Sequence, residues 1–257
     1  MMGGKRQKKG RIGQKVFTIL CFIVLVYSGY ELASIFIGYY KNRQVLAEVQ
    51  QLYYNEYSAE IDEVKEGEIR PQFHKLLQIN PDIIGWITID DTMVNYPILQ
   101  ADTNEYYLYR NYKKENSRAG SIFMDYRNDI TAHDRNTIIY GHSMKDGSMF
   151  NQLKKFLNKD FFESHQTIYF DTLYGAYDAK VFAVYHTTTD FDYIQTEFNS
   201  DGEYAALLQK MMDESVHWTD VELQADDQIL TLSTCDSMLD PDKGRFVVQA
   251  KLVPRSG

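Results

Sequence analysis

Hydrophobic positions change their pattern twice along the chain. Over residues 16–40 apolar residues run almost without interruption, and Glu31 is the only charged residue among them. Over residues 45–53 apolar residues recur at helical spacing among glutamine and glutamate. After Pro81, short runs rich in β-branched and aromatic residues take over, as is typical of strands. The pattern predicts an apolar helix, a helical connection and a mostly β domain.

The β domain is expected to contain eight strands. They are predicted over residues 83–89, 93–99, 121–124, 137–140, 167–171, 176–186, 228–234 and 245–252. Helices are predicted over residues 73–79, 149–157 and 203–216. Because helices do not alternate regularly with the strands, the pattern favours a β-barrel or sandwich with inserted helices over a doubly wound sheet.

The N-terminal pattern predicts a membrane anchor. The run over residues 16–40 exceeds the roughly 20 residues that cross a bilayer, and six basic residues precede it. The positive-inside tendency places residues 1–15 in the cytoplasm and the remaining chain outside. A cleaved secretory signal is the alternative. The run is long for a signal and lacks a small-x-small cleavage site, so an uncleaved, single-pass anchor is favoured.

These patterns divide the chain into five segments. Residues 1–15 are predicted to be a cytoplasmic tail, 16–40 the anchor, 41–79 a helical stalk and cap, and 80–252 the β domain. The last residues read LVPRSG and resemble the protease-site linker of an expression tag. Residues 253–257 are therefore set apart from the predicted fold.

Composition and charge exclude several classes of function. The chain has 257 residues, of which 44% are hydrophobic, so it can build a core. The net charge of −9 hides an asymmetry, because residues 41–257 hold 21 basic and 35 acidic residues. So acidic a body does not suit the phosphate backbone of a nucleic acid. No nucleic-acid partner is expected.

The two cysteines lie in different environments. Cys21 falls inside the apolar run, which leaves Cys235 as the only thiol of the predicted external part. Two cysteines are too few for a disulfide-rich fold or a cysteine zinc site. The six histidines show no metal-ligand spacing, and the segment DPDKG (240–244) lacks the later glutamate of a calcium loop. No metal site is predicted.

Three residues at predicted strand ends could form a cysteine-based catalytic site. Cys235 ends one apolar run, and Arg245 begins the next one ten residues later. His142 follows the run TIIY and Gly141. A thiol nucleophile needs a proton donor for the leaving amine and a donor for the oxyanion. The alternatives are a buried structural cysteine, a surface cation and a structural histidine.

Several motifs resemble those of one known family. TIIYGHS (137–143) and TLSTCD (231–236), with Arg245 ten residues after the cysteine, look like a sortase. The stretches IIGWITI, VNYPILQ, YYLYRNY and GSIFMDYRN resemble class B sortases in particular, as does the helix-bearing insertion between residues 186 and 234. The resemblance runs from about residue 70 to residue 252.

The resemblance implies an eight-stranded β-barrel with inserted helices that acts as a cysteine transpeptidase. Cys235 would cleave an NPxT(N/G)-like sorting signal of a surface protein after its threonine, through a thioester. His142 would move protons, and Arg245 would stabilise the oxyanion. A peptidoglycan precursor or cross-bridge amine would then accept the protein. The family also implies that no cofactor is needed.

The resemblance further implies a set of substrate-binding residues, each of which could instead be a core or surface residue. They are Asn104, Leu108, Tyr140, Thr189, Tyr193, Ile194, Ser233 and Asp236. Three other functions stay open at this point. They are a pilin-polymerising sortase, a secreted cysteine hydrolase, and a non-catalytic membrane-anchored surface module.

Overall fold

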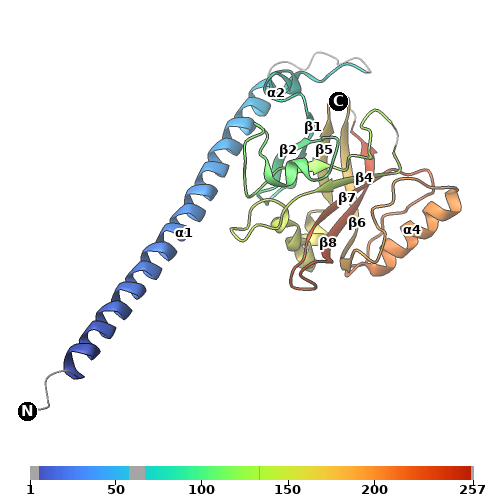
Figure 1. Cartoon of the computed structure of the whole chain (residues 1–257). Coiled ribbons are helices and arrows are strands. Elements are labelled where there is room, and N and C mark those ends of the chain that lie inside the picture. Colours follow the sequence, from blue (N-terminus) through green and yellow to red (C-terminus); the bar gives the residue numbers. More distant parts are fainter. Residues whose placement is uncertain (1–5, 58–66, 133, 256–257) are drawn as a thin grey trace, which may run out of the picture. The chain divides into compact units, whose positions relative to one another are not determined.

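A computed structural model describes residues 6–57, 67–132 and 134–255 of the chain. It contains two compact units, Met1–Gln44 and Val45–Gly257. Helix α1, Arg6–Tyr57, begins in the first unit and ends in the second. Within the first unit most of the large apolar side chains of this helix are exposed. Figure 1 shows the helix and the barrel.

Helix α1 contains the predicted anchor. Over the described residues it is the one helix long and apolar enough to cross a membrane, with a candidate span of Gly13–Asn55 and a mean hydropathy of 2.0. The helix extends well beyond the predicted run of residues 16–40. Residues 1–5 of the predicted cytoplasmic tail lie outside the described residues.

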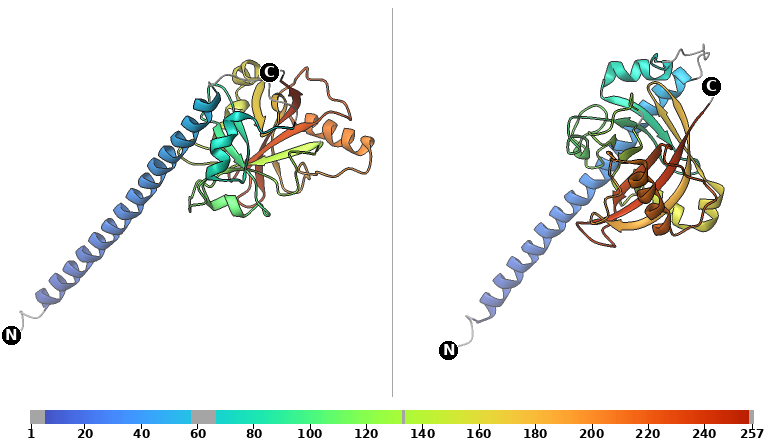
Figure 2. Two further views of the ribbon diagram at one scale, coloured as in Figure 1. Left: turned by 90° about the horizontal axis from the view of Figure 1, so that it is seen from above. Right: turned by 90° about the vertical axis from the view of Figure 1, so that its right-hand side faces the viewer.

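The second unit is built on a closed barrel of eight strands, as expected (Figures 1 and 2). The strands are β1 Ile83–Thr88, β2 Asn95–Leu99, β3 Ile122–Met124, β4 Asn136–Tyr140, β5 Thr167–Thr172, β6 Ala176–Thr188, β7 Ile229–Cys235 and β8 Gly244–Pro254. Around the barrel they follow the order β1-β2-β3-β4-β7-β8-β6-β5. Strands β2–β3 and β4–β7 pair in parallel, and the other neighbours are antiparallel.

Helices decorate this barrel. The α-helices are α2 His74–Ile79, α3 Lys159–Ser164 and α4 Asp201–Glu214, and the 3₁₀ helices are η1 Pro71–Phe73, η2 Tyr106–Tyr109 and η3 Phe150–Leu157. The sequence pattern did not predict α3, which Asn158 caps by accepting a hydrogen bond from the Phe161 amide. Helix α4 packs outside the barrel against β6 (Figure 2).

Alternating side chains on the strands build two cores. Leu230 and Leu232 of β7 point into the barrel core, together with Phe246 of β8. Ile229 and Val247 point outward into the cluster beneath α4. This period of two places every second residue of β7 on the outer face, so Cys235 emerges on that face and not in the barrel core.

The segment predicted as a stalk and cap packs on the barrel. Val49 and Tyr53 of α1 are buried in one cluster with Phe73 and Trp86. The Tyr53 ring stacks on the Trp86 indole with centroids 4.2 Å apart. The later part of the 41–79 segment is thus integrated into the second unit, although residues 58–66 lie outside the described residues.

Strand β8 extends further than predicted. Its antiparallel partnership with β6 continues to the pair Tyr177–Pro254, whereas the sequence analysis ended the fold at residue 252. Arg255 then forms an ion pair with Asp171 at 2.6 Å. Hydrogen bonding along β6 therefore draws part of the C-terminal segment into the sheet, irrespective of its resemblance to a tag.

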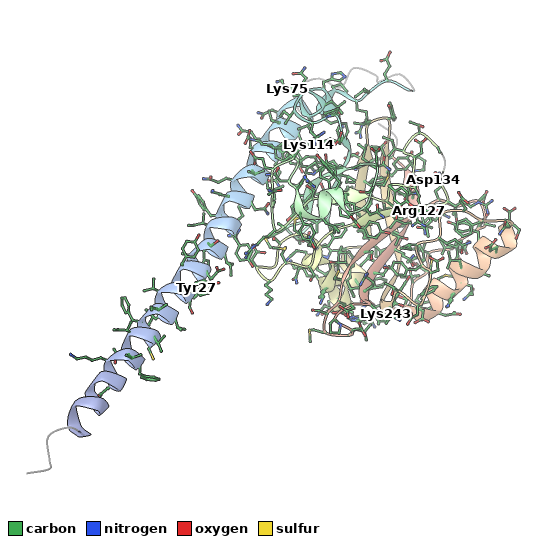
Figure 3. All side chains as sticks on the ribbon, viewed as in Figure 1. Tyr27, Lys75, Lys114, Arg127, Asp134 and Lys243 are labelled. Carbon is green, nitrogen blue, oxygen red and sulfur yellow. The ribbon has the colours of Figure 1, made fainter. Side chains whose placement is uncertain are left out.

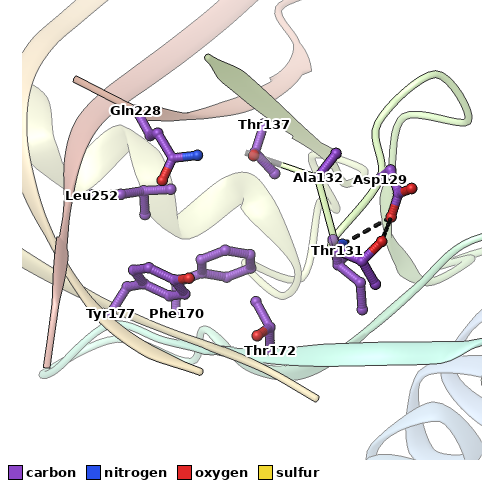
Figure 4. A pocket seen from close by; sticks show the side chains of 10 residues that line it. Asp129, Thr131, Ala132, Thr137, Phe170, Thr172, Tyr177, Gln228 and Leu252 are labelled. Carbon is purple, nitrogen blue, oxygen red and sulfur yellow. Dashed lines mark hydrogen bonds between the residues drawn. The ribbon is translucent and has the colours of Figure 1, made fainter. Parts of the chain in front are cut away.

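The two ends of the barrel differ. At the end where β8 finishes, a cavity of about 50 Å³ lies between β4, β5, β6 and β8, lined in part by Thr137, Thr172, Tyr177 and Leu252 (Figure 4). At the opposite end β7 finishes at Cys235 and β8 begins. The candidate catalytic residues lie at this second end.

Candidate active site

Two neighbouring strands bring Cys235 and Arg245 together. In the antiparallel register of β7 and β8, Cys235 is directly opposite Arg245. Side chains opposite each other in such a pair project from the same face of the sheet. The Cys235 thiol is exposed, which contradicts the alternative of a buried structural cysteine.

The parallel pairing of β4 with β7 carries His142 to the same end. Tyr140 lies beside Ser233, and the Gly141 amide donates to the Ser233 carbonyl at 3.2 Å. Two further residues along each strand reach His142 and Cys235. The three predicted catalytic residues therefore lie at the ends of adjacent strands.

A backbone carbonyl orients the His142 ring. His142 Nε2 lies 2.8 Å from the carbonyl oxygen of Leu108. A carbonyl can only accept, so Nε2 carries the proton of the neutral ring. Nδ1 is then the ring nitrogen that can take up and return a proton. The Tyr109 ring lies alongside, with its centroid 5.9 Å from that of the imidazole.

Glycine is required between Tyr140 and His142. A Cβ atom on Gly141 would lie 2.4 Å from Ile122 Cδ1 and 2.8 Å from the Phe150 ring. Both side chains are buried in the barrel core, so neither has room to move aside. Glycine at position 141 thus allows His142 to follow a strand that packs closely against the barrel core.

The loop between β7 and β8 holds the Arg245 guanidinium. Arg245 Nη1 donates to the carbonyl of Gly244 at 2.8 Å and to that of Asp242 at 3.2 Å. A Cβ on Gly244 would meet the Asp236 carbonyl at 2.1 Å, so the loop closes only with glycine there. Arginine has five N–H donors, and those on Nε and Nη2 are not engaged by the described residues.

A buried pair of hydroxyls includes Ser233, which precedes Cys235 by two residues on the outer face of β7. The Tyr193 hydroxyl and Ser233 Oγ are 2.8 Å apart, and both residues are buried. Burial raises the pKa of Tyr193 above its ordinary value, although the bond to Ser233 and the Arg245 charge oppose it. The phenol is neutral and fixes the segment after β6 against the catalytic strand.

The Asp236 side chain is buried and bound on both oxygens. Its carboxylate accepts from His186 Nδ1 at 2.6 Å and from Lys154 Nζ at 3.2 Å. Burial acts to raise the pKa of Asp236, but these two bonds outweigh it and hold the pKa below its usual range. The ionised carboxylate thereby joins the start of the β7–β8 loop to β6 and η3.

The other predicted substrate-binding residues lie at the end of β4 and in two segments that are called walls below. Asn104 and Leu108 lie in the segment around η2, where Leu108 binds His142. Ile194 and Thr189 lie in the segment after β6, and the Thr189 amide donates to the carbonyl of Lys243 at 3.1 Å. Tyr140 is the last residue of β4. Their role in binding substrate stays a prediction.

Four polar residues near this site have no role predicted from the sequence. Lys154 and His186 bind Asp236, while Asp125 and Arg127 bind each other at 2.8 Å. The sequence does contain a signal for Asp125 and Arg127. They belong to the polar segment DYRN, which directly follows the apolar run IFM at a strand end. Among the described residues there is no group of three or more His, Cys, Asp or Glu side chains that could hold a metal ion.

Comparison with known proteins agrees with this geometry. The family model described as the sortase domain matches residues 87–253. Sortase B of Listeria monocytogenes is 44% identical over 241 residues, covering 94% of this chain and 97% of the relative. Sortase B of Staphylococcus aureus is 38% identical over 238 residues, covering 93% and 96%.

Solved structures agree as well. The crystal structure of sortase B from B. anthracis in complex with AAEK1 is 54% identical, with a TM-score of 0.77, and covers 86% of this chain and all of that one. The S. aureus sortase B–substrate complex is 39% identical with a TM-score of 0.79, and covers 86% of this chain and 100% of that one. The chain belongs to the sortase family of transpeptidases. Within that family it is a class B sortase, a cell-wall sorting enzyme.

Proposed function

We propose that this class B sortase cleaves an NPxT(N/G)-like sorting signal after its threonine and transfers the protein to a peptidoglycan amine. The observation that carries the proposal is the register pair Cys235–Arg245 with His142 at the end of the adjacent parallel strand. Cys235 would be the nucleophile, His142 the acid–base group and Arg245 the cationic donor, all at one end of the barrel.

In the first half-reaction the Cys235 thiolate attacks the carbonyl carbon after the threonine. The carbonyl oxygen becomes an oxyanion, which the unengaged Arg245 donors stabilise. As the C–N bond breaks, protonated His142 gives a proton to the leaving amine. The products are a thioester on Cys235, a neutral histidine and the released C-terminal peptide.

In the second half-reaction an amine attacks the thioester carbonyl. Neutral His142 accepts the proton of the incoming amine, the new amide bond forms and the C–S bond breaks. The thiolate and the imidazolium are thereby restored. A sortase B similar to this chain, at 39% identity, has been solved in complex with Gly3, so triglycine is a suitable probe amine.

We further propose that α1 anchors the enzyme with its N-terminus in the cytoplasm and the barrel outside. The apolar candidate span Gly13–Asn55 and the basic residues before residue 16 support this orientation. The proposed partners are surface proteins with a sorting signal, the peptidoglycan amine and the membrane itself.

The test uses the full chain in detergent with an NPQTN-type peptide, with and without triglycine. Mass spectrometry should find peptide cleaved after threonine and joined to triglycine, and Cys235→Ala should make neither product. Cleavage that yields only the free acid would identify a hydrolase. Transfer to a pilin lysine peptide in preference to triglycine would identify a pilin polymerase.

A thiol reagent separates the enzyme from a non-catalytic surface module. A methanethiosulfonate should react with exposed Cys235 and stop cleavage completely. Full activity after quantitative modification of Cys235 would remove the thiol from the mechanism.

A further inference from the structure

Three consecutive backbone carbonyls in the segment after β6 are each held by a side chain of the barrel. Asn136 Nδ2 donates to the carbonyls of Tyr193 at 3.1 Å and Gln195 at 3.0 Å. Arg127 Nη2 donates to the carbonyl of Ile194 at 3.0 Å. This wall contains the predicted substrate-binding residues Tyr193 and Ile194, so its position depends on Asn136 and Arg127.

Arg127 is itself fixed by a carboxylate. Arg127, labelled in Figure 3, follows β3 in the sequence. It binds Asp125 through two parallel bonds, Nε to Oδ1 at 2.8 Å and Nη2 to Oδ2 at 2.9 Å. The Asp125 side chain is fully buried, whereas that of Arg127 is 34% exposed. Such a fork permits a single orientation of the guanidinium plane.

The same carboxylate reaches the opposite wall. Asp125 Oδ2 accepts from Asn104 Nδ2 at 3.1 Å and from the Tyr140 hydroxyl at 2.8 Å. Asn104 Oδ1 in turn accepts from the Tyr126 amide at 3.0 Å, so both ends of the Asn104 amide are occupied. The wall that carries Asn104 continues to Leu108, whose carbonyl orients His142.

The charge state of this cluster is defined. Burial acts to raise the pKa of Asp125, but the bonds from Arg127, Tyr140 and Asn104 outweigh it and lower the pKa. Burial and the Asp125 charge both raise the pKa of Tyr140. At neutral pH the cluster therefore combines a carboxylate, a guanidinium and a neutral phenol, in which each partner keeps its bonding role.

We propose that Asp125 and Arg127 are a positioning pair that sets the separation of the two walls of the sorting-signal groove. The pair links the Asn104–Leu108 wall to the Tyr193–Gln195 wall without touching Cys235. It should therefore govern how tightly an extended peptide binds and leave the chemistry at the thiol unchanged. The inference rests on the proposed function, because the occupant of the groove is the sorting peptide.

The decisive variant is Arg127→Met, which keeps the length of the side chain and removes both the fork and the bond to Ile194. We expect KM for an NPQTN-type peptide to rise about tenfold while kcat stays within about twofold, the pattern of lost binding that ground state and transition state share. Arg127→Lys provides one compact donor in place of the fork, so it should fall between the wild type and Arg127→Met. If Arg127→Met fails to fold, Arg127→Lys carries the test.

Arg70→Met is the matched control. Arg70 Nη1 binds the Asp171 carboxylate at 2.9 Å, which is also an arginine–aspartate pair but has no bond to either wall among the described residues. We expect Arg70→Met to destabilise the protein without a change in KM. An equal rise of KM in both variants would assign the effect to general loosening of the barrel and overturn the proposal.

A second measurement reports on the wall directly. In the full chain, held in detergent, amide hydrogen exchange of the segment after β6 should be faster in Arg127→Met than in the wild type and unchanged in Arg70→Met. Unchanged exchange in Arg127→Met would overturn the proposal whatever the kinetics show. A lower kcat with unchanged KM would also overturn it, since the pair would then act on the chemical step.

These readouts separate failure of the inference from failure of the proposed function. If the wild type cleaves no sorting peptide, the proposed function fails. The exchange comparison between Arg127→Met and Arg70→Met still decides whether the pair holds the wall. If the wild type cleaves the peptide and Arg127→Met matches it in KM, the function stands and the positioning pair does not.

Discussion

Two aspartates of this barrel have almost the same surroundings and different consequences. Asp125 accepts from the Tyr140 hydroxyl and from Arg127, while Asp171 accepts from the Tyr53 hydroxyl at 2.9 Å and from arginine. Both carboxylates are buried. A buried carboxylate needs partners that offset its lost hydration, and tyrosine with arginine meets that need in both places.

The two clusters differ in what they join. Asp171 lies near the end of β5 and collects Tyr53 of α1, Arg70 before η1, and Arg255 after β8. Tyr53 and Arg70 come from the early part of the second unit and Arg255 from its last residues. The cluster therefore ties both ends of this unit to β5. Asp125 joins segments that flank the catalytic strands. The same chemistry thus stabilises the fold in one cluster and is expected to shape the substrate groove in the other.

The largest contrast is expected from the arginines at the two ends of β8. Arg245→Lys should reduce peptide cleavage about a hundredfold to a thousandfold, because an ammonium cannot replace the guanidinium fork beside the oxyanion. Its stability should stay within about 0.5 kcal/mol of the wild type. Turnover of an NPQTN-type peptide and urea unfolding measure the two quantities.

Arg255→Lys is the control for that variant. Arg255 binds Asp171 and is partly exposed, so its loss should cost about 1 kcal/mol or less and leave turnover unchanged. Near-equal turnover of Arg245→Lys and Arg255→Lys would contradict the catalytic role of Arg245.

The two tyrosines should give a smaller contrast. Tyr53→Phe and Tyr140→Phe each remove one hydrogen bond to a buried carboxylate, which costs about 1–3 kcal/mol of unfolding free energy. Only Tyr140→Phe should also raise KM, because only Asp125 contacts the groove walls. Thermal unfolding and peptide kinetics test the pair, and a rise of KM in Tyr53→Phe would break the distinction between the two clusters.

Acid should weaken the Asp125 cluster. The pKa of Asp125 is lower in the folded protein than in the unfolded chain, where it is about 3.9. Its stabilisation is therefore complete above that value and is lost as the pH falls through it toward the folded pKa. Urea unfolding between about pH 5 and pH 3 should show a shallower loss of stability in Asp125→Asn than in the wild type. Parallel curves would contradict the charged state of Asp125.

Removal of residues 1–44 should have the smallest effect. The second unit, Val45–Gly257, contains the barrel and all the proposed catalytic residues, and Val49 and Tyr53 remain to cover Trp86. The shortened protein should be soluble without detergent and cleave the peptide at the full-length rate. Aggregation or loss of turnover would make the first unit part of the catalytic fold.

The strands and the placing of the candidate catalytic residues at strand ends could be predicted because their signals are local. Runs of β-branched residues mark the strands, and the position of Cys235, His142 and Arg245 at the ends of such runs indicates a shared edge. Register could not be read from those runs, although the ten residues between Cys235 and Arg245 suggested two joined strands. The resemblance to sortases supplied the roles.

The two carboxylate clusters could not be predicted. Asp171 is bound by residues 118, 101 and 84 positions away along the chain, and such pairings follow only from the closed barrel. Arg255 was set apart because its segment resembles a tag, yet pairing of β8 with β6 carries it to Asp171. Asp125 and Arg127 stood within a motif used for the family resemblance, but their link to Ile194 depends on the fold of the segment after β6.

The most direct test of the account is the covalent intermediate on Cys235. The wild type is mixed with an NPQTN-type peptide without amine, and the mass of the intact protein is measured within the first turnovers. We predict an added mass equal to the peptide fragment that ends in threonine, located on Cys235 and removed by triglycine as the transfer product forms. Peptide cleavage without this adduct, or the same adduct in Cys235→Ala, would contradict the account.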